Sequence, residues 1–195
     1  AAVQAAFKSA LEPYQDSGKL PDNTGIFVVA MGKMGAGELN YSSDIDLIVM
    51  FDDRNMDHFE ASQLRQVLVR ATRTATKLLN EITEHGYVFR TDLRLRPDPS
   101  STPICVGMSS ALDYYESLGR TWERAAFIKA RICAGDRIAG TAFLEQMVPF
   151  VWRRHLDFAA IEEAHALRLK IRIKAGVRGH INVRGHDVKL GRGGI

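Results

Sequence analysis

The sequence lacks the features that mark membrane-spanning and secreted proteins. In its 195 residues no apolar run approaches the roughly 20 residues that a membrane-spanning helix needs. The first residues show no basic start followed by an apolar core, so they predict no signal peptide. An initiator methionine is also absent, and we expect the chain to be a fragment of a longer protein. These absences favour a water-soluble domain without a membrane partner.

Cysteine is scarce and histidine carries no motif. Cys105 and Cys133 have neither CxxC nor zinc-ligand spacing, so we expect two reduced thiols in a cytoplasmic protein. The six histidines include no HExxH motif, and no metal or catalytic role is assigned to them. The net charge of +3 suits a phosphate-bearing ligand but is too small to indicate nucleic acid.

The apolar pattern predicts an α+β fold, with a small sheet, flanking helices and a helical C-terminal region. Short apolar or alternating runs predict strands at 26–31, 44–51 and 87–97. Helical spacing occurs before Pro13, between Asp53 and His85, and near 109–118, 121–134, 138–152 and 158–177. We place a catalytic core at residues 1–107 and a helical region that completes the site at residues 108–195.

Asp44 and Asp46 stand at the start of the second predicted strand. Because successive strand side chains point to opposite faces, these two carboxylates share one face and Ile45 takes the other. Two neighbouring carboxylates repel each other unless a cation lies between them. Magnesium prefers oxygen ligands and takes one or two carboxylates, so the pair predicts a Mg²⁺ site.

Asp92 lies among arginines on the third predicted strand. Alternation places Asp92 on one face together with Arg90, Arg94 and Arg96, while the other face is apolar except for a threonine. If this strand neighbours the DxD strand, Asp92 becomes a third metal ligand. We then expect Arg94 and Arg96 to face phosphate, for which the guanidinium fork is well shaped.

A glycine-rich turn separates the first two predicted strands. Its residues GKMGAGELNYSS include no Walker A motif, but glycine permits exposed backbone N–H groups that cradle phosphate oxygens. Candidates for phosphate or nucleotide contact are Gly35, Ala36, Ser42 and Ser43, with Lys129 from a later segment. Each motif also has an ordinary interpretation: a solvated strand edge, a surface ladder of ion pairs, or a plain strand connection. The order of the three motifs along the chain favours a metal-dependent catalytic site over these ordinary interpretations.

The segments MGKMGAGELNYSSDIDLIVMF, FRTDLRLRPDPSSTP, ALDYYESLGRTWERAAFIKARICAGD and KLGRGGI resemble, in this order, the motifs of the glutamine synthetase adenylyltransferase family. The resemblance covers most of residues 26–195. It implies a small mixed β-sheet core of the DNA polymerase β-like nucleotidyltransferase type. One departure is Ala36, because the superfamily often has Gly-Ser in this turn; backbone N–H groups, Ser42 or Ser43 would then have to contact phosphate.

The family has two such catalytic domains, and GELN before SDIDLI is similar to the N-terminal one. The resemblance implies removal of AMP from a tyrosine of glutamine synthetase by inorganic phosphate, which yields ADP, with Asp44, Asp46 and Asp92 as metal ligands. It also implies regulation by a PII signalling protein and a role in nitrogen metabolism. Alternatives are adenylyl transfer from ATP, a polymerase-like or tRNA-directed transferase, and a catalytically silent nucleotide-binding or regulator-binding module.

Overall fold

Two buried antiparallel strands form the centre of the fold in the computed structural model. The structure describes residues 1–21, 23–54, 56 and 58–152, and beyond these only 162, 165, 166, 168–170 and 173. β1 (Ile26–Ala30) pairs with β2 (Ile45–Phe51), so that Ile26 lies opposite Phe51 and Ala30 opposite Leu47. Both strands match the predicted apolar runs closely, because their side chains are buried on both faces of the sheet.

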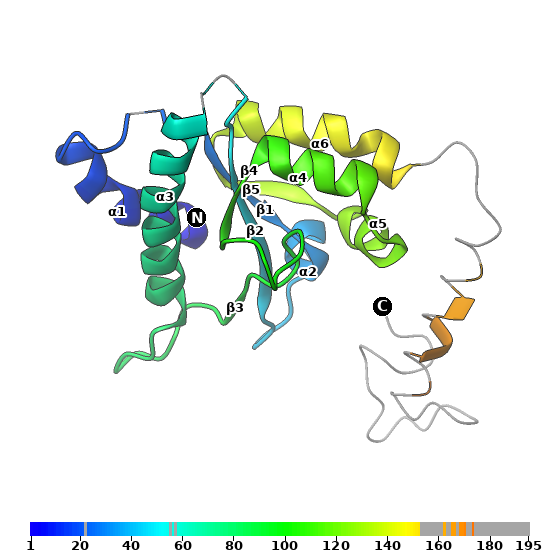
Figure 1. Cartoon of the computed structure of the whole chain (residues 1–195). Coiled ribbons are helices and arrows are strands. Elements are labelled where there is room, and N and C mark those ends of the chain that lie inside the picture. Colours follow the sequence, from blue (N-terminus) through cyan, green and yellow to red (C-terminus); the bar gives the residue numbers. More distant parts are fainter. Residues whose placement is uncertain are drawn as a thin grey trace. The chain divides into compact units, whose positions relative to one another are not determined.

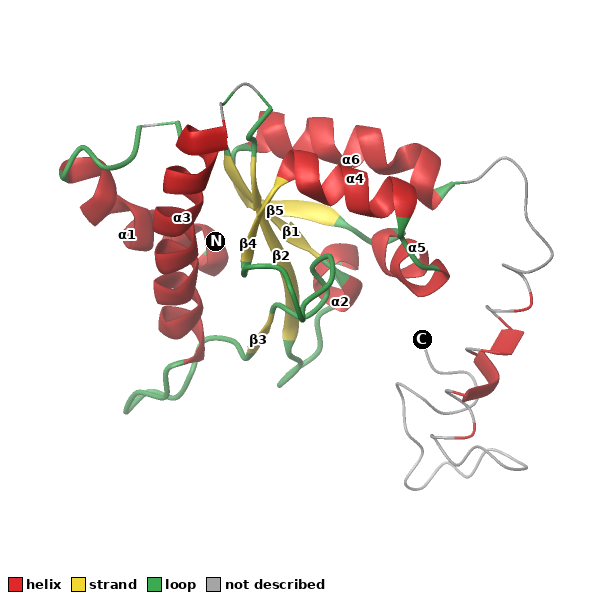
Figure 2. Ribbon diagram, in the orientation of Figure 1, coloured by secondary structure: helices red, strands yellow, loops and turns green. Residues whose placement is uncertain are grey.

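Three further strands complete a mixed sheet (Figure 2). β5 (Arg131–Gly135) pairs antiparallel with β1 on one side. β3 (Thr91–Asp92) and β4 (Cys105–Gly107) pair parallel with β2 on the other side. The helices pack against this sheet, which confirms the α+β class with a small mixed sheet and flanking helices.

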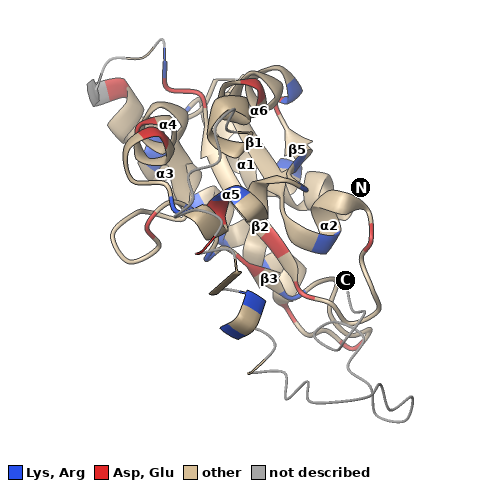
Figure 3. Cartoon of the chain, turned by 90° about the vertical axis from the view of Figure 1, so that its right-hand side faces the viewer, with Lys and Arg blue, Asp and Glu red and all other residues tan. Residues whose placement is uncertain are grey.

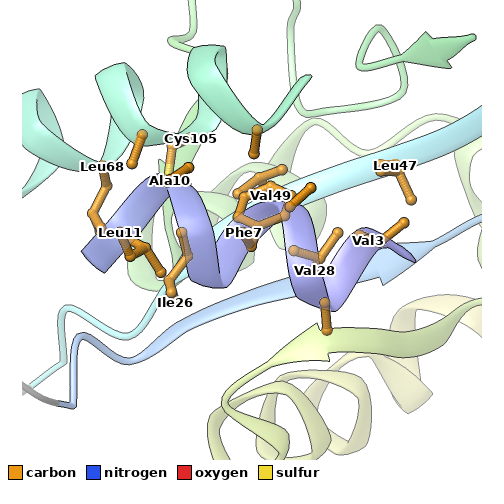
Figure 4. Packing of buried hydrophobic residues seen from close by; sticks show 14 of the residues in the cluster. Val3, Phe7, Ala10, Leu11, Ile26, Val28, Leu47, Val49, Leu68 and Cys105 are labelled. Carbon is orange, nitrogen blue, oxygen red and sulfur yellow. The ribbon is translucent and has the colours of Figure 1, made fainter. Parts of the chain in front are cut away.

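Helices cover both faces of the sheet (Figure 1). α1 (Ala2–Asp16) and α3 (His58–Asn80) contact each other and close one core cluster with the sheet. Figure 4 shows Phe7 of α1 beside Val49 of β2, and Ala10 of α1 on the side of Leu68 and Cys105. The second cluster, centred on Phe27, Tyr115 and Phe143, packs under α4 (Met108–Ser117), α5 (Thr121–Phe127) and α6 (Arg137–Val151).

Several predicted boundaries are wrong for identifiable reasons. The predicted strand 87–97 is a strand only at Thr91–Asp92, because the Arg96 guanidinium donates to backbone carbonyls of Leu93, Pro99 and Thr102 and holds the following chain in turns. The first helix does not end near Pro13 but continues to Asp16. In that helix the hydrogen bond that proline lacks is offset by packing of the apolar face.

The predicted helix 121–134 is also wrong in its second half. α5 ends at Phe127, and Arg131–Gly135 form β5, whose Ile132 and Ala134 pair with β1 and are buried. The long helix between Asp53 and His85 is confirmed over His58–Asn80, with five of its predicted apolar positions buried: Leu64, Leu68, Ala71, Ala75 and Leu79. β4, at Cys105–Gly107, lies in a stretch for which the apolar pattern predicts no strand.

The chain divides into two compact units, Ala1–Trp152 and Arg153–Ile195. The described residues of the second unit are helical, within the predicted helix 158–177, and the rest of that prediction lies outside the described residues. A catalytic core at residues 1–107 stays a proposal; β5, beyond that boundary, belongs to the same sheet as β1 and β2. Where the structure describes helices, none is long and apolar enough to cross a bilayer.

Candidate active site

The pairing of β2 with β3 brings Asp46 and Asp92 side by side. The two strands run parallel, with Ile45 opposite Thr91 and Asp46 opposite Asp92. The Ile45 N–H donates to the Arg90 carbonyl at 2.8 Å and extends this pairing by one step. Asp44 precedes β2 directly, so the three carboxylates predicted from two motifs lie at one edge of the sheet. Figure 3 shows acidic and basic segments together around β2 and β3.

Arginines from the β3 segment neutralise these carboxylates. Arg94 donates to Asp92 through both its Nε and Nη2 atoms, at 2.9 and 2.5 Å to Oδ2, and this hydrogen bond is the main reason that the pKa of Asp92 is lowered. The pKa of Arg94 is raised first by that bond and also by the charges of Asp46 and Asp44. The Arg94 guanidinium therefore lies within electrostatic reach of all three carboxylates.

Arg90 binds Asp44 in the structure. The sequence pattern predicted that Arg90 shares a face with Asp92 but gave it no role. Its Nε donates to Asp44 Oδ1 at 2.5 Å and its Nη2 donates to the Ser42 carbonyl. The Asp44 carboxylate accordingly raises the pKa of Arg90, chiefly through this hydrogen bond. The alternation of residues 87–97, which places Arg90 on the same face as Asp92, was the sequence feature that could have indicated this role.

The glycine-rich turn forms a short helix, α2 (Gly32–Ala36), against Asp46. The Met31 N–H donates to the Asp46 carbonyl at 2.9 Å. Gly32 has a positive φ of 54°, and a Cβ added there would lie 3.1 Å from Asp46 Oδ2. Glycine is thus required at this position both for its backbone conformation and for the close approach of the turn to the carboxylate.

The other end of α2 is fixed by Arg131, the first residue of β5. Arg131 donates from Nε and Nη2 to the carbonyls of Gly35 and Met34, at 3.1 and 2.9 Å. These carbonyls belong to the last turn of α2, and the Met34 carbonyl also accepts from the Gly37 N–H at 3.2 Å. A Cβ added to Gly35 would collide with the backbone oxygens of Lys129 and Ala30, so only glycine fits between them.

The remaining predicted contacts have other partners in the structure. Lys129 Nζ pairs with Glu38 at 2.8 Å, and Arg96 is bound to backbone carbonyls of its own loop. The Gly35 N–H donates to Met31, whereas Ala36 is exposed next to it. Ser42 has a left-handed φ of 57°, and together with Ser43 it lines a groove beside Asp44. Phosphate contact by these residues stays a prediction.

The carboxylates are chemically suited to bind magnesium, but their side chains are not arranged around a common metal position. In the described part of the chain no three acidic, histidine or cysteine side chains are gathered closely enough to hold a metal ion as they lie. Asp44 forms an ion pair with Arg90 instead, and Asp92 forms one with Arg94. Carboxylate oxygens on adjacent strands are nevertheless the donor set that Mg²⁺ takes, with phosphate oxygens and water as further ligands. Asp44, Asp46 and Asp92 are the residues that would hold it.

Comparison with known proteins finds a matching family model and curated relatives. Residues 1–146 match the family model described as glutamate-ammonia ligase adenylyltransferase. A relative from Bradyrhizobium sp. (strain BTAi1) is 53% identical over 98% of this chain and 19% of its own length. One from Rhizobium meliloti is 49% identical over 100% of this chain and 20% of its own length. Both are called bifunctional glutamine synthetase adenylyltransferase/adenylyl-removing enzyme, and the chain spans about a fifth of their length.

Proposed function

Because this chain belongs to the glutamate-ammonia ligase adenylyltransferase family, we propose that it is a nucleotidyltransferase domain that removes AMP from glutamine synthetase. The names of the relatives contain both adenylyl transfer and adenylyl removal. The GELN turn, which resembles the N-terminal catalytic domain of the family, favours removal. The single observation that carries a catalytic role is the in-register placement of Asp46 beside Asp92, with Asp44 adjacent.

In the proposed reaction an oxygen of inorganic phosphate attacks the phosphorus of AMP bound to a tyrosine. The new P–O bond makes ADP, the bond from phosphorus to the tyrosine oxygen breaks, and the phenolate takes up a proton. Phenol has a pKa near 10, so phenolate is a far better leaving group than an alkoxide. Arg94 is placed to balance negative charge next to the carboxylates.

Magnesium would supply neutralisation of the charge that develops on the transferred phosphoryl group. The carboxylates would hold it, and the arginines would orient phosphate oxygens by bidentate hydrogen bonds. Arg94 is the better candidate for this than Arg96, because its side chain is 84% exposed whereas the Arg96 guanidinium is committed to its own loop. The short turn α2 orders the backbone beside Asp46.

The partners of this reaction are AMP-modified glutamine synthetase, inorganic phosphate and ADP. Action in the cytoplasm and regulation by a PII signalling protein stay predictions from the resemblance. Adenylyl transfer from ATP would use the same carboxylates and is the second candidate. In that reaction the tyrosine oxygen attacks the α-phosphorus of ATP, the bond to the β-phosphate breaks, and pyrophosphate leaves.

The test is to incubate this chain with AMP-modified glutamine synthetase, Mg²⁺ and phosphate and to measure ADP. We expect phosphate-dependent ADP release that is lost in Asp44→Asn and Asp46→Asn. Asp113→Asn, an exposed carboxylate on α4, is the matched control and should retain activity. AMP transfer from ATP onto unmodified glutamine synthetase without ADP release would assign the second candidate, and nucleotide binding without either activity would indicate a silent module.

A further inference from the structure

A groove of about 720 Å³ opens beside the carboxylates. One wall is the connection from α2 to β2, residues 39–43, and the other is the segment before β3, residues 87–89. In Figure 1 both connections lie at the end of the sheet where β3 is found. The proposed reaction uses none of the side chains in either wall except the two serines.

The Asp44–Arg90 ion pair adjoins the groove. Ser43 and Phe89, one from each wall, directly precede the two members of that pair. Arg90 also donates to the Ser42 carbonyl in one wall, and its guanidinium carbon lies 5.8 Å from the centre of the Tyr87 ring in the other. The same arginine therefore contacts both walls and ties them to Asp44, so the groove adjoins the candidate site.

The lining of the groove has no formal charge. Its eight residues are aliphatic, aromatic, serine or asparagine: Leu39, Asn40, Tyr41, Ser42, Ser43, Tyr87, Val88 and Phe89. Phosphate groups are held most strongly by cationic donors, and the lining side chains include no cation. Hydroxyl and amide groups between apolar surfaces instead suit a polypeptide, whose backbone hydrogen-bonds and whose side chains fill apolar space.

Large apolar side chains are exposed along the groove. Tyr41 is 104% exposed, Val88 52% and Tyr87 40%. Exposed tyrosines offer a large rigid surface with a polar tip, and they are enriched among residues that dominate binding between proteins. A patch of this composition next to a catalytic site is typical of a surface that a protein substrate covers.

We infer that this groove binds the polypeptide segment that flanks the AMP-modified residue of the protein substrate. The inference rests on the proposed function, because the modified residue must then reach Asp46 and Asp92 while its own chain leaves along an adjoining surface. The groove is such a surface, and its uncharged lining requires a flanking segment with uncharged, partly apolar side chains. Tyr41 and Tyr87 are the anchors, one from each wall.

The first measurement is binding of AMP-modified glutamine synthetase to this chain without phosphate, so that phosphorolysis cannot proceed. Tyr41→Ala and Tyr87→Ala should each raise Kd by about tenfold or more, as expected for anchor residues. Ile138→Ala on α6, which removes an 85% exposed apolar side chain away from the groove, should leave Kd unchanged. Unchanged Kd in both tyrosine variants, or no binding by the unaltered chain, would overturn the inference.

Two further measurements distinguish binding of the protein substrate from binding of the nucleotide, and the groove proposal from the proposed activity. Binding of ADP should be the same in the tyrosine variants as in the unaltered chain; equal weakening of ADP would mean that the groove holds the nucleotide, and the inference would be wrong. In phosphorolysis the variants should raise KM for the modified protein and leave KM for phosphate and kcat unchanged. Tyrosine-dependent binding of the modified protein without ADP release would refute the proposed activity and leave the groove assignment standing.

Discussion

Asp46 and Asp92 are direct partners across two parallel strands, although they lie in different motifs of the sequence. Strand neighbours are about 5 Å apart at the backbone, so their charges repel strongly unless a cation is close. Arg94 now supplies that positive charge from the Asp92 side. A divalent cation in the same place would replace the arginine and release it toward phosphate.

The first prediction concerns this cation. Asp46→Asn and Asp92→Asn should each weaken Mg²⁺ binding in the presence of ADP by at least about tenfold, since each removes a charged oxygen ligand. Isothermal titration calorimetry measures the affinity, and the exposed Asp113→Asn on α4 serves as the control. Affinity that is the same in all three variants would place the metal elsewhere or exclude it.

The second prediction tests the packing of α2 against the backbone of Lys129 and Ala30. Gly35→Ala should lower the free energy of unfolding by about 1–3 kcal/mol, because the new methyl group meets the backbone oxygens of Lys129 and Ala30, which cannot move aside freely. Gly37→Ala is the matched control. Its Cβ meets nothing within 4 Å, so only its positive φ of 76° opposes the change, at about 1 kcal/mol. Urea unfolding should rank Gly35→Ala as the more damaging; the reverse order would contradict the packing described.

The third prediction concerns the buried carboxylate of Glu123, which is 2% exposed. It accepts from the Arg120 N–H at 2.8 Å and from the Tyr114 hydroxyl at 3.2 Å, which fixes the start of α5 against α4. Glu123→Ala should cost about 2–4 kcal/mol of unfolding free energy, since it removes packing and leaves both donors without this partner. Tyr114→Phe should cost about 1 kcal/mol.

Burial and the Glu123 charge both raise the pKa of Tyr114, so its hydroxyl stays a donor through the neutral range. Thermal or urea unfolding of both variants provides the comparison. A Glu123→Ala variant as stable as the parent would show that the carboxylate does not hold α5 in place.

The fourth prediction follows from Cys133, a free thiol in β5 whose pKa is raised to about 11 by burial. At pH 8 only about one thiol in a thousand is then ionised, so alkylation by iodoacetamide should be slow in the folded protein and fast in urea. A thiol whose folded pKa is raised stabilises the fold fully below its unfolded pKa, and this contribution is lost as pH rises toward 11. Between about pH 9 and 11 the parent should therefore lose stability relative to Cys133→Ala. Rapid labelling of Cys133 at pH 8 without urea would contradict this burial.

The local pattern of apolar residues was sufficient to predict the elements whose structure depends on burial alone. The strands at 26–30 and 45–51 are continuous apolar runs, and the spacing within His58–Asn80 marks one helical face. The same alternation predicted that Asp44 and Asp46 share a face and that Arg90 and Arg94 accompany Asp92. These features follow from side-chain periodicity, which any short segment contains by itself.

Only the tertiary structure decided which segments meet. β5 is a strand because β1 offers an open edge, although residues 121–134 have helical spacing. Arg96 binds carbonyl groups of its own loop and Lys129 pairs with Glu38, partners that no local pattern identifies. The groove needs two loops that are more than forty residues apart. The sequence by itself determined the faces of its elements and the family to which it belongs. Register, partners and the groove depend on contacts between distant segments, whose energies no local periodicity contains.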